Sequence, residues 1–431
     1  MSFRKLPRKV LSTAESSWLL SRRIILRAGV LTLTLFGGCY QRQEFKKIEV
    51  SPDSMEKRCG DTPVALRSYC ERVISEGRRN AVLNHMRMGV RAMELGHREQ
   101  AEECFDFALN EIEAIYSNTD SSAKARSLYY EEGMKDFKGE PYERCMAYYY
   151  RGLLYLQKGD YDNARACFKG GILQDAFAEE EQYRCDFATL IFLEGWAAQL
   201  AGDSEVAKAC YAEMKRYRPD FEAPSEGANI LIIAETGTSP RKLSDGVGHA
   251  ELKFARGRNF LEKSAEIAIN GNQQMRLFPM EDVAWQAMSR GGRAVDKILQ
   301  GKVEFRKTNE QVGTVLTDVS SNAMISAPLW GDNVEAVQGI SAAMGLVGVI
   351  QMAAGARARP HADTRYWDNI PDGIHVATIF GEPGTYRIRA NFKDENGGTV
   401  PGVQVEKTFE VKKAGAALFW FRSRESVTSK L

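Results

Sequence analysis

Residues 152–168 read GLLYLQKGDYDNARACF, and their pattern of small, turn-forming and aromatic residues occurs three times in the chain. The three copies align without a gap. Each has an early glycine, a second glycine seven residues later, and then an alanine, a cysteine and an aromatic residue. The shared positions are Gly89, Gly96, Ala101, Cys104 and Phe105; Gly152, Gly159, Ala164, Cys167 and Phe168; and Gly195, Gly202, Ala207, Cys210 and Tyr211. Agreement at the same positions in three copies indicates an internal repeat.

Each copy predicts two antiparallel helices joined by a tight turn. The second glycine suits a left-handed cap that ends the first helix, and Asp160, which follows Gly159, is expected to cap the second helix. The early glycine and the alanine are small enough to let the two helices approach closely. We expect the aromatic side chain to fill the space between successive hairpins.

This pattern resembles the tetratricopeptide repeat, with units at about residues 82–115, 145–178 and 188–221, and Pro219 closing the third unit. The resemblance implies a helical stack whose first helices line a concave groove for an amphipathic helix or an extended peptide. The predicted partner-binding residues are Met86, Glu94, Tyr149, Leu153, Gln157, Phe192, Trp196 and Gln199. The alternative is that these side chains form the core between repeats, or are covered by the chain's own second half.

The N-terminus predicts export. Seven basic residues within positions 1–38 precede a short apolar run, Ala28–Phe36, which ends at Gly37-Gly38-Cys39. This segment resembles a bacterial lipoprotein signal, which would be cut before Cys39 so that the cysteine carries the lipid. Arg22-Arg23 also resembles a twin-arginine export signal. Tyr40 favours the outer membrane, facing the periplasm, and the alternative is a basic N-terminus on a cytosolic protein.

Charge and cysteine content narrow the function further. Residues 39–431 contain 51 basic and 56 acidic residues, so the mature chain lacks the excess of positive charge that is typical of nucleic-acid-binding proteins. Seven cysteines remain after Cys39, all before residue 211, and none has the close spacing of a zinc site or a redox motif. Disulfides and buried thiols are therefore expected, and no metal or cofactor.

The second half predicts strands mixed with helices. Asn229–Thr236 is an apolar run typical of a strand, Ala250–Ala255 alternates, and a helix is expected over Met280–Leu299 with a break at Gly291-Gly292. From Gly373 the pattern predicts an antiparallel sheet. Its expected strands are Ile374–Phe380 and Tyr386–Phe392 around the turn Gly381–Gly384, then Gln404–Val411 after Asn396-Gly397-Gly398, and a fourth strand at Ala417–Phe421.

The predicted fold class is therefore α+β, an all-α stack of tetratricopeptide-like hairpins followed by a mixed part with a small antiparallel sheet. The expected divisions are a signal peptide (1–38), a linker that could include a capping helix (39–80), the repeats (81–224), a mixed strand and helix domain (225–372) and the sheet with a C-terminal tail (373–431).

Two features of the second half stand apart. Val334–Ala356 is rich in glycine and alanine, and could be a packed helix, a membrane-surface helix or a membrane span. Arg365, Tyr366 and Trp367 form a candidate interaction cluster, since a guanidinium beside two rings can bind a carboxylate or a partner's side chain. The alternative for this cluster is a structural clamp between helix and sheet.

Glu235-Thr236-Gly237-Thr238-Ser239-Pro240, followed far downstream by Ala362–Trp367 and Pro371, resembles an uncharacterised family of bacterial lipoproteins with N-terminal tetratricopeptide-like repeats. The family assigns no reaction, and no catalytic motif such as Gly-x-Ser-x-Gly is present.

We therefore expect an envelope scaffold without enzymatic activity that binds other envelope proteins or peptides, with self-association as a further option. The alternatives are an enzyme acting on an envelope polymer with the repeats as a targeting module, and a membrane-active component built around residues 334–356.

Overall fold

The computed structural model describes residues 47–116, 136–137, 139–176, 187–245, 251–271, 273–288, 363–411 and 416–426. These residues all belong to one compact unit, Lys47–Leu431. Cys39 and the segment Val334–Ala356 lie outside the described residues, as does the predicted helix beyond Met288. Among the residues that are described, no helix combines the length and apolar character needed to cross a membrane.

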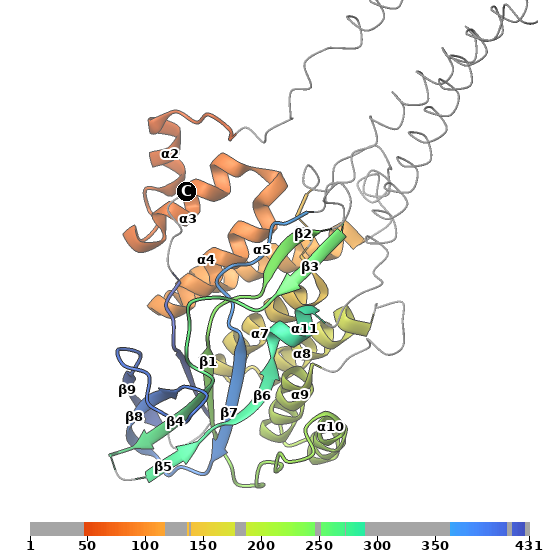
Figure 1. Ribbon diagram of the computed structural model, residues 1–431, viewed down its shortest axis with the longest axis vertical. Helices are drawn as coiled ribbons and strands as arrows, with labels where there is room; N and C mark the ends of the chain where they lie inside the picture. The colour runs from red at the N-terminus through yellow and green to blue at the C-terminus, as the bar shows by residue number, and fades with distance from the viewer. Residues whose placement is uncertain are drawn as a thin grey trace, which may run out of the picture. The chain divides into compact units, whose positions relative to one another are not determined.

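The first half is helical (Figure 1). Its helices are α2 (Pro52–Cys59), α3 (Val64–Glu76), the 3-10 helix η1 (Arg78–Asn80), α4 (Ala81–Leu95), α5 (Arg98–Tyr116), α7 (Pro141–Lys158), α8 (Tyr161–Ala176), α9 (Ala188–Leu200) and α10 (Ser204–Tyr217). The pairs α4 and α5, α7 and α8, and α9 and α10 are the three predicted hairpins. Each hairpin turns at its second glycine.

The turns confirm the predicted cap chemistry. Gly96, Gly159 and Gly202 have φ angles of 79°, 77° and 83°, in the left-handed region where a side chain would be strained. Asp160 accepts a hydrogen bond from the backbone N–H of Asn163 at 3.3 Å, as an N-cap residue does. The third unit repeats this arrangement, because Asp203 accepts from the N–H of Val206 at 3.2 Å.

The early glycine makes room for the aromatic ring of its own hairpin. A Cβ atom added at Gly152 would lie 2.2 Å from the ring of Phe168, and one at Gly89 would lie 2.9 Å from Phe105. We expected the rings to fill the space between hairpins, but they first close the space within each hairpin. Phe105 also reaches the next unit, where its ring stacks 5.7 Å from that of Tyr150.

In the part of the second half that the structure describes, the chain adds strands and the short helix α11, which confirms the α+β class. These elements are β1 (Ile230–Thr236), β2 (Arg241–Asp245), β3 (Glu251–Ala255), β4 (Ser264–Ile269), β5 (Gln273–Arg276), β6 (Phe278–Asp282), α11 (Val283–Met288), β7 (Gly373–Ile379), β8 (Gly384–Lys393), β9 (Val405–Val411) and β10 (Ala417–Arg422). Strands β2 and β3 form a separate hairpin.

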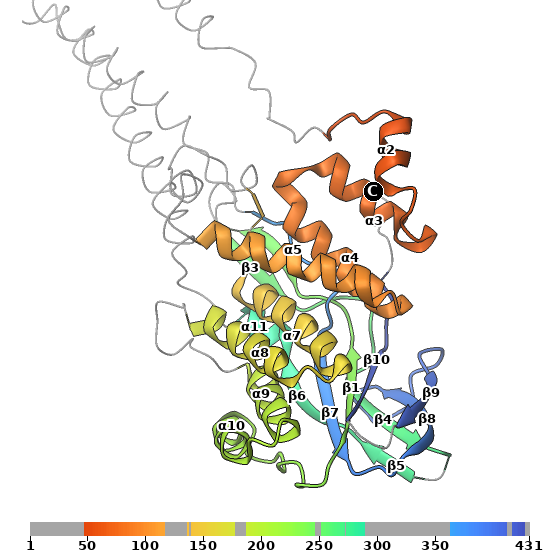
Figure 2. The ribbon, with the colours of Figure 1, turned by 180° about the vertical axis from the view of Figure 1, so that it is seen from behind.

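The remaining strands form two stacked sheets. The central sheet has the order β10-β1-β7-β6, and the outer sheet has the order β5-β4-β8-β9. Both views of the ribbon place helices α7 to α10 on one side of the central sheet and the outer sheet on the other (Figures 1 and 2). The central sheet is thus buried between two layers.

This layering explains the apolar run of β1, which is buried along its whole length. Side chains alternate across a strand, so Leu231 and Ile233 join the core shared with the repeats, whereas Ile230 and Ile232 join the core between the sheets. Within the described residues, the outer sheet is covered on the face that packs against the central sheet. Strand β4 accordingly alternates between buried and partly exposed positions.

The predicted hairpin of Ile374–Phe380 with Tyr386–Phe392 is wrong. Strand β7 pairs with β1 and β6, and β8 pairs with β4 and β9, so the turn Gly381–Gly384 carries the chain from one sheet to the other. A hairpin and a connection between two sheets have the same local sequence pattern here, because each consists of two alternating strands joined by a tight turn. The second predicted turn does join paired strands, β8 and β9.

The strand Ala417–Phe421 is confirmed as β10, but it pairs in parallel with β1 in the central sheet. The strands of residues 225–372 and of residues 373–431 share both sheets, so the structure shows no division between residues 372 and 373. Met280 lies in β6, and the helix expected from this residue begins at Val283 as α11.

The described cysteines form a disulfide and several buried thiols, as expected, whereas Cys185 lies outside the described residues. Cys59 and Cys70 are joined, which ties α2 to α3. Cys104, Cys145 and Cys210 are buried free thiols, and Cys167 is partly buried. Burial raises the pKa of the Cys104 thiol to about 12, so the reactive thiolate is scarce at neutral pH.

We predict that Gly152→Ala lowers the free energy of unfolding by about 1–3 kcal/mol, because the new methyl group would overlap the Phe168 ring in a packed core. Urea unfolding of the purified protein measures this loss. The variant Gly152→Ala/Phe168→Ala is the control, because the double change removes the overlap and should cost less than the two single changes added together. Strict additivity would contradict this packing account.

Candidate functional site at the junction of repeats and sheet

The concave side of the repeat stack is filled by the chain's own second half. The core shared by the helices and the central sheet includes Leu231 and Ile233 of β1 together with Trp367 and Trp420. The predicted groove residues Met86, Tyr149, Leu153, Phe192 and Trp196 are at most 1% exposed. The structure therefore shows the alternative left open by the sequence, in which these side chains are covered within the same chain.

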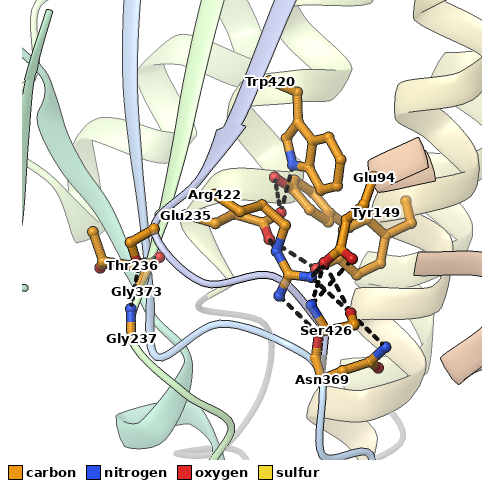
Figure 3. Close-up of polar contacts among 12 residues, drawn as sticks. Glu94, Tyr149, Glu235, Thr236, Gly237, Asn369, Gly373, Trp420, Arg422 and Ser426 are labelled. Carbon is orange, nitrogen blue, oxygen red and sulfur yellow. Dashed lines mark hydrogen bonds and ion pairs between the residues drawn. The ribbon is translucent and has the colours of Figure 1, made fainter. Parts of the chain in front are cut away.

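Glu235 is the polar centre of this junction. It stands at the end of β1 on the helix side, with its side chain buried. Its Oε1 accepts hydrogen bonds from the Tyr149 hydroxyl at 3.1 Å and the Trp420 indole N–H at 2.8 Å. Its Oε2 accepts from the Tyr150 hydroxyl at 3.0 Å. Figure 3 shows Tyr149 of α7 and Trp420 of β10 converging on this carboxylate.

Arg422 of β10 supplies the countercharge. Its Nε lies 2.9 Å from Glu235 Oε2, and its Nη1 forms an ion pair with Glu94 of α4. Nη2 donates to the backbone carbonyl of Asn369 at 2.7 Å. Glu94 also accepts from the backbone N–H and the hydroxyl of Ser426, at 3.0 Å and 2.8 Å. One guanidinium thus connects the first repeat, the central sheet and the end of the chain (Figure 3).

Burial and neighbouring charge act in opposite directions on these groups. Burial raises the pKa of Glu235, while Arg422 and the three hydrogen-bond donors lower it. Burial lowers the pKa of Arg422, but Tyr150, Glu235 and Glu94 outweigh this effect and hold the pKa above its ordinary value. Burial also raises the pKa of Tyr149 and Tyr150, so both hydroxyls keep the protons that they donate.

The predicted interaction cluster is a clamp. Trp367 is buried, and its ring packs 5.7 Å from that of Tyr150 and 6.3 Å from that of Phe105. Arg365 donates to Asn80 Oδ1 at 2.7 Å and to Asp363 Oδ1 at 2.8 Å. The structure therefore shows the alternative of a structural clamp for these two residues, with the segment 363–369 strapped across the first two repeats. Tyr366 is half-buried between them.

A second buried carboxylate fixes this strap at the start of α7. Glu143 Oε1 accepts from the backbone N–H of Trp367 at 2.6 Å, and its Oε2 accepts from the N–H of Glu140 at 2.6 Å. Burial raises the pKa of Glu143 to about 7, although Lys242 and the Trp367 N–H lower it. Lys242 lies 2.7 Å from Glu140, so the hairpin of β2 and β3 is tied to the same helix end.

The other predicted groove residues lie at the margins. Gln199 donates to the carbonyl of Ser225 at 2.9 Å and accepts from the Tyr211 hydroxyl at 3.0 Å. Gln157 is half-buried at the end of α7. Within the ranges that the structure describes, no group of three or more His, Cys, Asp or Glu side chains could hold a metal ion.

The space between the two sheets contains one buried histidine. His375 Nε2 lies 3.0 Å from the Thr236 hydroxyl, and its Nδ1 has no hydrogen-bond partner. Burial lowers the pKa of His375 to about 4, and Arg276 adds to the effect. The ring is therefore neutral at physiological pH.

The comparisons with known proteins agree with the helical half. The model of the tetratricopeptide repeat family matches residues 147–175, which cover most of α7 and α8. The chain therefore contains a tetratricopeptide repeat. Neither the search of curated proteins nor the search of solved structures found a match to this chain.

Sequence reasoning singled out Glu94, Tyr149 and the segment beginning at Glu235, but it missed Arg422. A glutamate at the end of an apolar strand signals a buried charge that needs a partner. The sequence offers 58 lysines and arginines as candidates for that partner. Arg422 is identified as the partner of Glu235 only by the parallel pairing of β10 with β1, which places the two residues side by side.

We predict that Arg422→Met lowers the free energy of unfolding by about 3–5 kcal/mol, because it leaves the carboxylates of Glu235 and Glu94 buried without a countercharge. Chemical denaturation measures the loss. Arg389→Met is the matched control, because Arg389 pairs with Glu406 on the exposed face of the outer sheet, where such a pair contributes at most about 1 kcal/mol. Equal losses in the two variants would contradict the role of Arg422.

We predict a pH effect from His375. Its pKa is about 4 in the folded protein and about 6.5 when unfolded, so between these values the unfolded chain binds a proton that the folded chain does not. Stability attributable to this ring should therefore fall by roughly 3 kcal/mol as the pH drops from 6.5 to 4. In denaturation experiments across that pH range, the free energy of unfolding of His375→Gln should lack this part of the pH dependence. A variant with the same slope as the wild type would contradict the assignment.

Proposed function

We propose that this protein is a lipid-anchored scaffold of the bacterial cell envelope that helps to assemble an envelope complex and performs no catalysis. The observation that carries the proposal is a stack of three helical hairpins, one of which matches the tetratricopeptide repeat. Repeats of this kind present extended surfaces to other proteins. The lipoprotein-like signal ending at Cys39 supports the location, since it would place a lipid at the start of the mature chain.

The disulfide supports export. Cys59 and Cys70 are eleven residues apart and close a small loop between α2 and α3. Structural disulfides of this kind persist in oxidising compartments and are rare in the cytosol of mesophilic bacteria. The first helix after the proposed anchor is therefore fastened by a bond that suits the periplasm.

The filled groove directs the search for partners to the outer helices. Residues such as Tyr149 and Trp196 are core, so a partner cannot contact them without unfolding the junction. The second helix of each hairpin remains at the surface, and Phe107 of α5 and Leu173 of α8 are exposed apolar side chains there. We propose that partner proteins bind this outer side of the repeats, because exposed apolar residues beside polar ones are typical of interaction surfaces.

Co-purification from detergent-solubilised envelope tests the proposal. We expect defined envelope proteins to accompany the wild-type chain, and the variant Phe107→Glu/Leu173→Glu to recover them about tenfold less or worse, as for residues that dominate an interface. The matched control is Leu243→Glu/Leu261→Glu, which changes two exposed leucines outside the repeats. Partners that are absent, or that are lost equally from both variants, would count against the proposal.

The same preparation tests the anchor through Cys39→Ser. The wild-type chain should fractionate with membranes, and the variant should appear in the soluble fraction after alkaline extraction. A variant that still resists extraction would overturn the lipid anchor as the means of attachment, and would favour insertion of the segment Val334–Ala356.

A further inference from the structure

The two stacked sheets end in four edge strands within the described residues. These are β10 and β6 in the central sheet, and β5 and β9 in the outer sheet. An edge strand has a row of backbone N–H and C=O groups without a partner in its own sheet, and such a row can pair with a further strand. Folded proteins usually protect these rows with short strands, proline, bulges or charged side chains.

Two of the four edges are protected by the form of the strand itself. Strand β5 has only four residues, Gln273–Arg276. Strand β6 contains Pro279, which has no N–H group to donate, and its register with β7 shifts between Pro279 and Glu281. Neither edge offers a long, regular row of backbone groups.

The edge of β10 is protected by a lysine from the other sheet. The N–H of Ser423, directly after β10, donates to the carbonyl of Glu235 in β1 at 2.9 Å. Backbone groups alternate in direction along a strand, so Trp420, three positions earlier, points its carbonyl away from β1. Lys407 Nζ donates to this carbonyl at 3.1 Å.

The edge of β9 lacks these protections. This strand pairs with β8 over seven residues in an unbroken register, from Val405 with Ala390 to Val411 with Gly384, and it contains no proline. Of the described strands, only β8 pairs with it, and β9 lies at the border of the ribbon in both views (Figures 1 and 2). Its alternate residues therefore hold N–H and C=O groups that no described strand engages.

The core-facing side chains of β9 indicate which kind of strand would fit beside it. Val405 and Phe409 are only partly buried at the margin of the core between the sheets, although the Phe409 ring stacks 3.9 Å from that of Phe419. Side chains of an added strand would alternate in the same way as those of β9. Apolar residues at every second position would cover the exposed parts of Val405 and Phe409.

The outward-facing side chains of β9 add a charge requirement. Glu406 forms an ion pair with Arg389 of β8 at 2.7 Å. Glu410 is exposed and lies opposite Thr385 of β8, on the same side of the sheet as Glu406. Opposite charges on neighbouring strands attract and like charges repel, so the strand that fits beside β9 carries basic residues opposite the two glutamates.

The same charges disfavour a second copy of β9 as the added strand. In the antiparallel register that pairs two copies over their whole length, Glu406 of each copy faces Glu410 of the other. Both contacts are repulsive. A basic strand from a different protein has no such conflict.

We propose that the free edge of β9 binds an extended segment of a partner protein as an added strand, with lysine or arginine opposite Glu406 and Glu410 and apolar side chains over Val405 and Phe409. Main-chain hydrogen bonds supply the affinity of such binding, and the alternating side chains supply its specificity. The strand lies beside the outer sheet, so it leaves the ion pair of Arg389 with Glu406 intact. The proposal concerns a surface separate from the outer helices and does not depend on the scaffold function.

A defined peptide tests the proposal on the full-length protein. The probe is a fluorescent peptide with the core Val-Lys-Val-Thr-Val-Lys-Val, which reads the same in both directions and so presupposes no strand orientation. We expect saturable binding in fluorescence anisotropy. At a peptide concentration of about ten times Kd, hydrogen exchange of the β9 amides that point away from β8 should slow by about tenfold. Exchange at Gln273–Arg276, on the opposite edge of the same sheet, should not change.

A scrambled peptide and two charge variants are the controls. The peptide Lys-Lys-Thr-Val-Val-Val-Val has the same composition without the alternation, and it should bind about tenfold more weakly or worse. Glu410→Lys should weaken binding of the alternating peptide about fivefold, because attraction becomes repulsion. Glu226→Lys makes the same change of charge at an exposed position between α10 and β1, and it should have no effect.

Four results would overturn the proposal. They are the absence of saturable binding, equal binding of the scrambled peptide, equal weakening by Glu410→Lys and Glu226→Lys, and full protection of the outward-pointing β9 amides before any peptide is added. The last result would mean that another part of this chain, or a second copy, already occupies the edge.

Discussion

A carboxylate at the end of a buried strand is the constraint on which the rest of this structure depends. Glu235 lies between the repeats and the central sheet, where an uncompensated charge would be costly. Arg422, Trp420 and two tyrosines of α7 satisfy it together. Because these partners come from distant parts of the chain, the charge is compensated only when the helices, β1 and β10 are all in place. The requirement therefore selects one arrangement of the two halves.

The repeats act here as an internal receptor. A tetratricopeptide stack ordinarily offers its concave side to another protein, but in this chain the segment 363–369 and the end of β10 occupy that side. The contacts have the character of peptide recognition, because Glu143 accepts a hydrogen bond from the backbone N–H of Trp367 and Glu94 accepts one from the backbone N–H of Ser426. Because the segments that fill the groove belong to the same chain, their binding to the repeats does not depend on the protein concentration.

The sequence predicted the helical half well because its signals are local. The left-handed glycines, Asp160 and the glycine that faces an aromatic ring all act within one hairpin. The strands were also predictable, since β1 and β3 have clear apolar patterns. The pairing of strands was not, because Gly381–Gly384 can join two paired strands or two separate sheets with the same residues.

The candidate site shows the same division between local and distant information. Tyr149 and Trp367 could be selected as rings at notable positions, but their burial depends on β1 and β10, which are brought there by pairings across more than 180 residues, such as Glu235 with Arg422. A ring that would serve as a binding hot spot on an open groove becomes core once the groove is filled. The residue type predicted an important contact but could not tell whether the contact lies within the chain or with a partner.

The packing of the two halves against each other also determines which surfaces remain accessible to a partner protein. With the concave side and both faces of the central sheet covered, the surface of the described residues includes α2 and α3, the outer helices α5, α8 and α10, the hairpin of β2 and β3, and the outer face of the outer sheet. That outer face is polar and internally paired, as in the contact of Arg389 with Glu406 at 2.7 Å. Leu173 of α8, by contrast, is an exposed apolar side chain at the surface of the repeats. An interaction with another protein that buries apolar area is therefore more favourable on the outer helices than on the outer sheet, because binding there removes exposed side chains from water without breaking an existing ion pair.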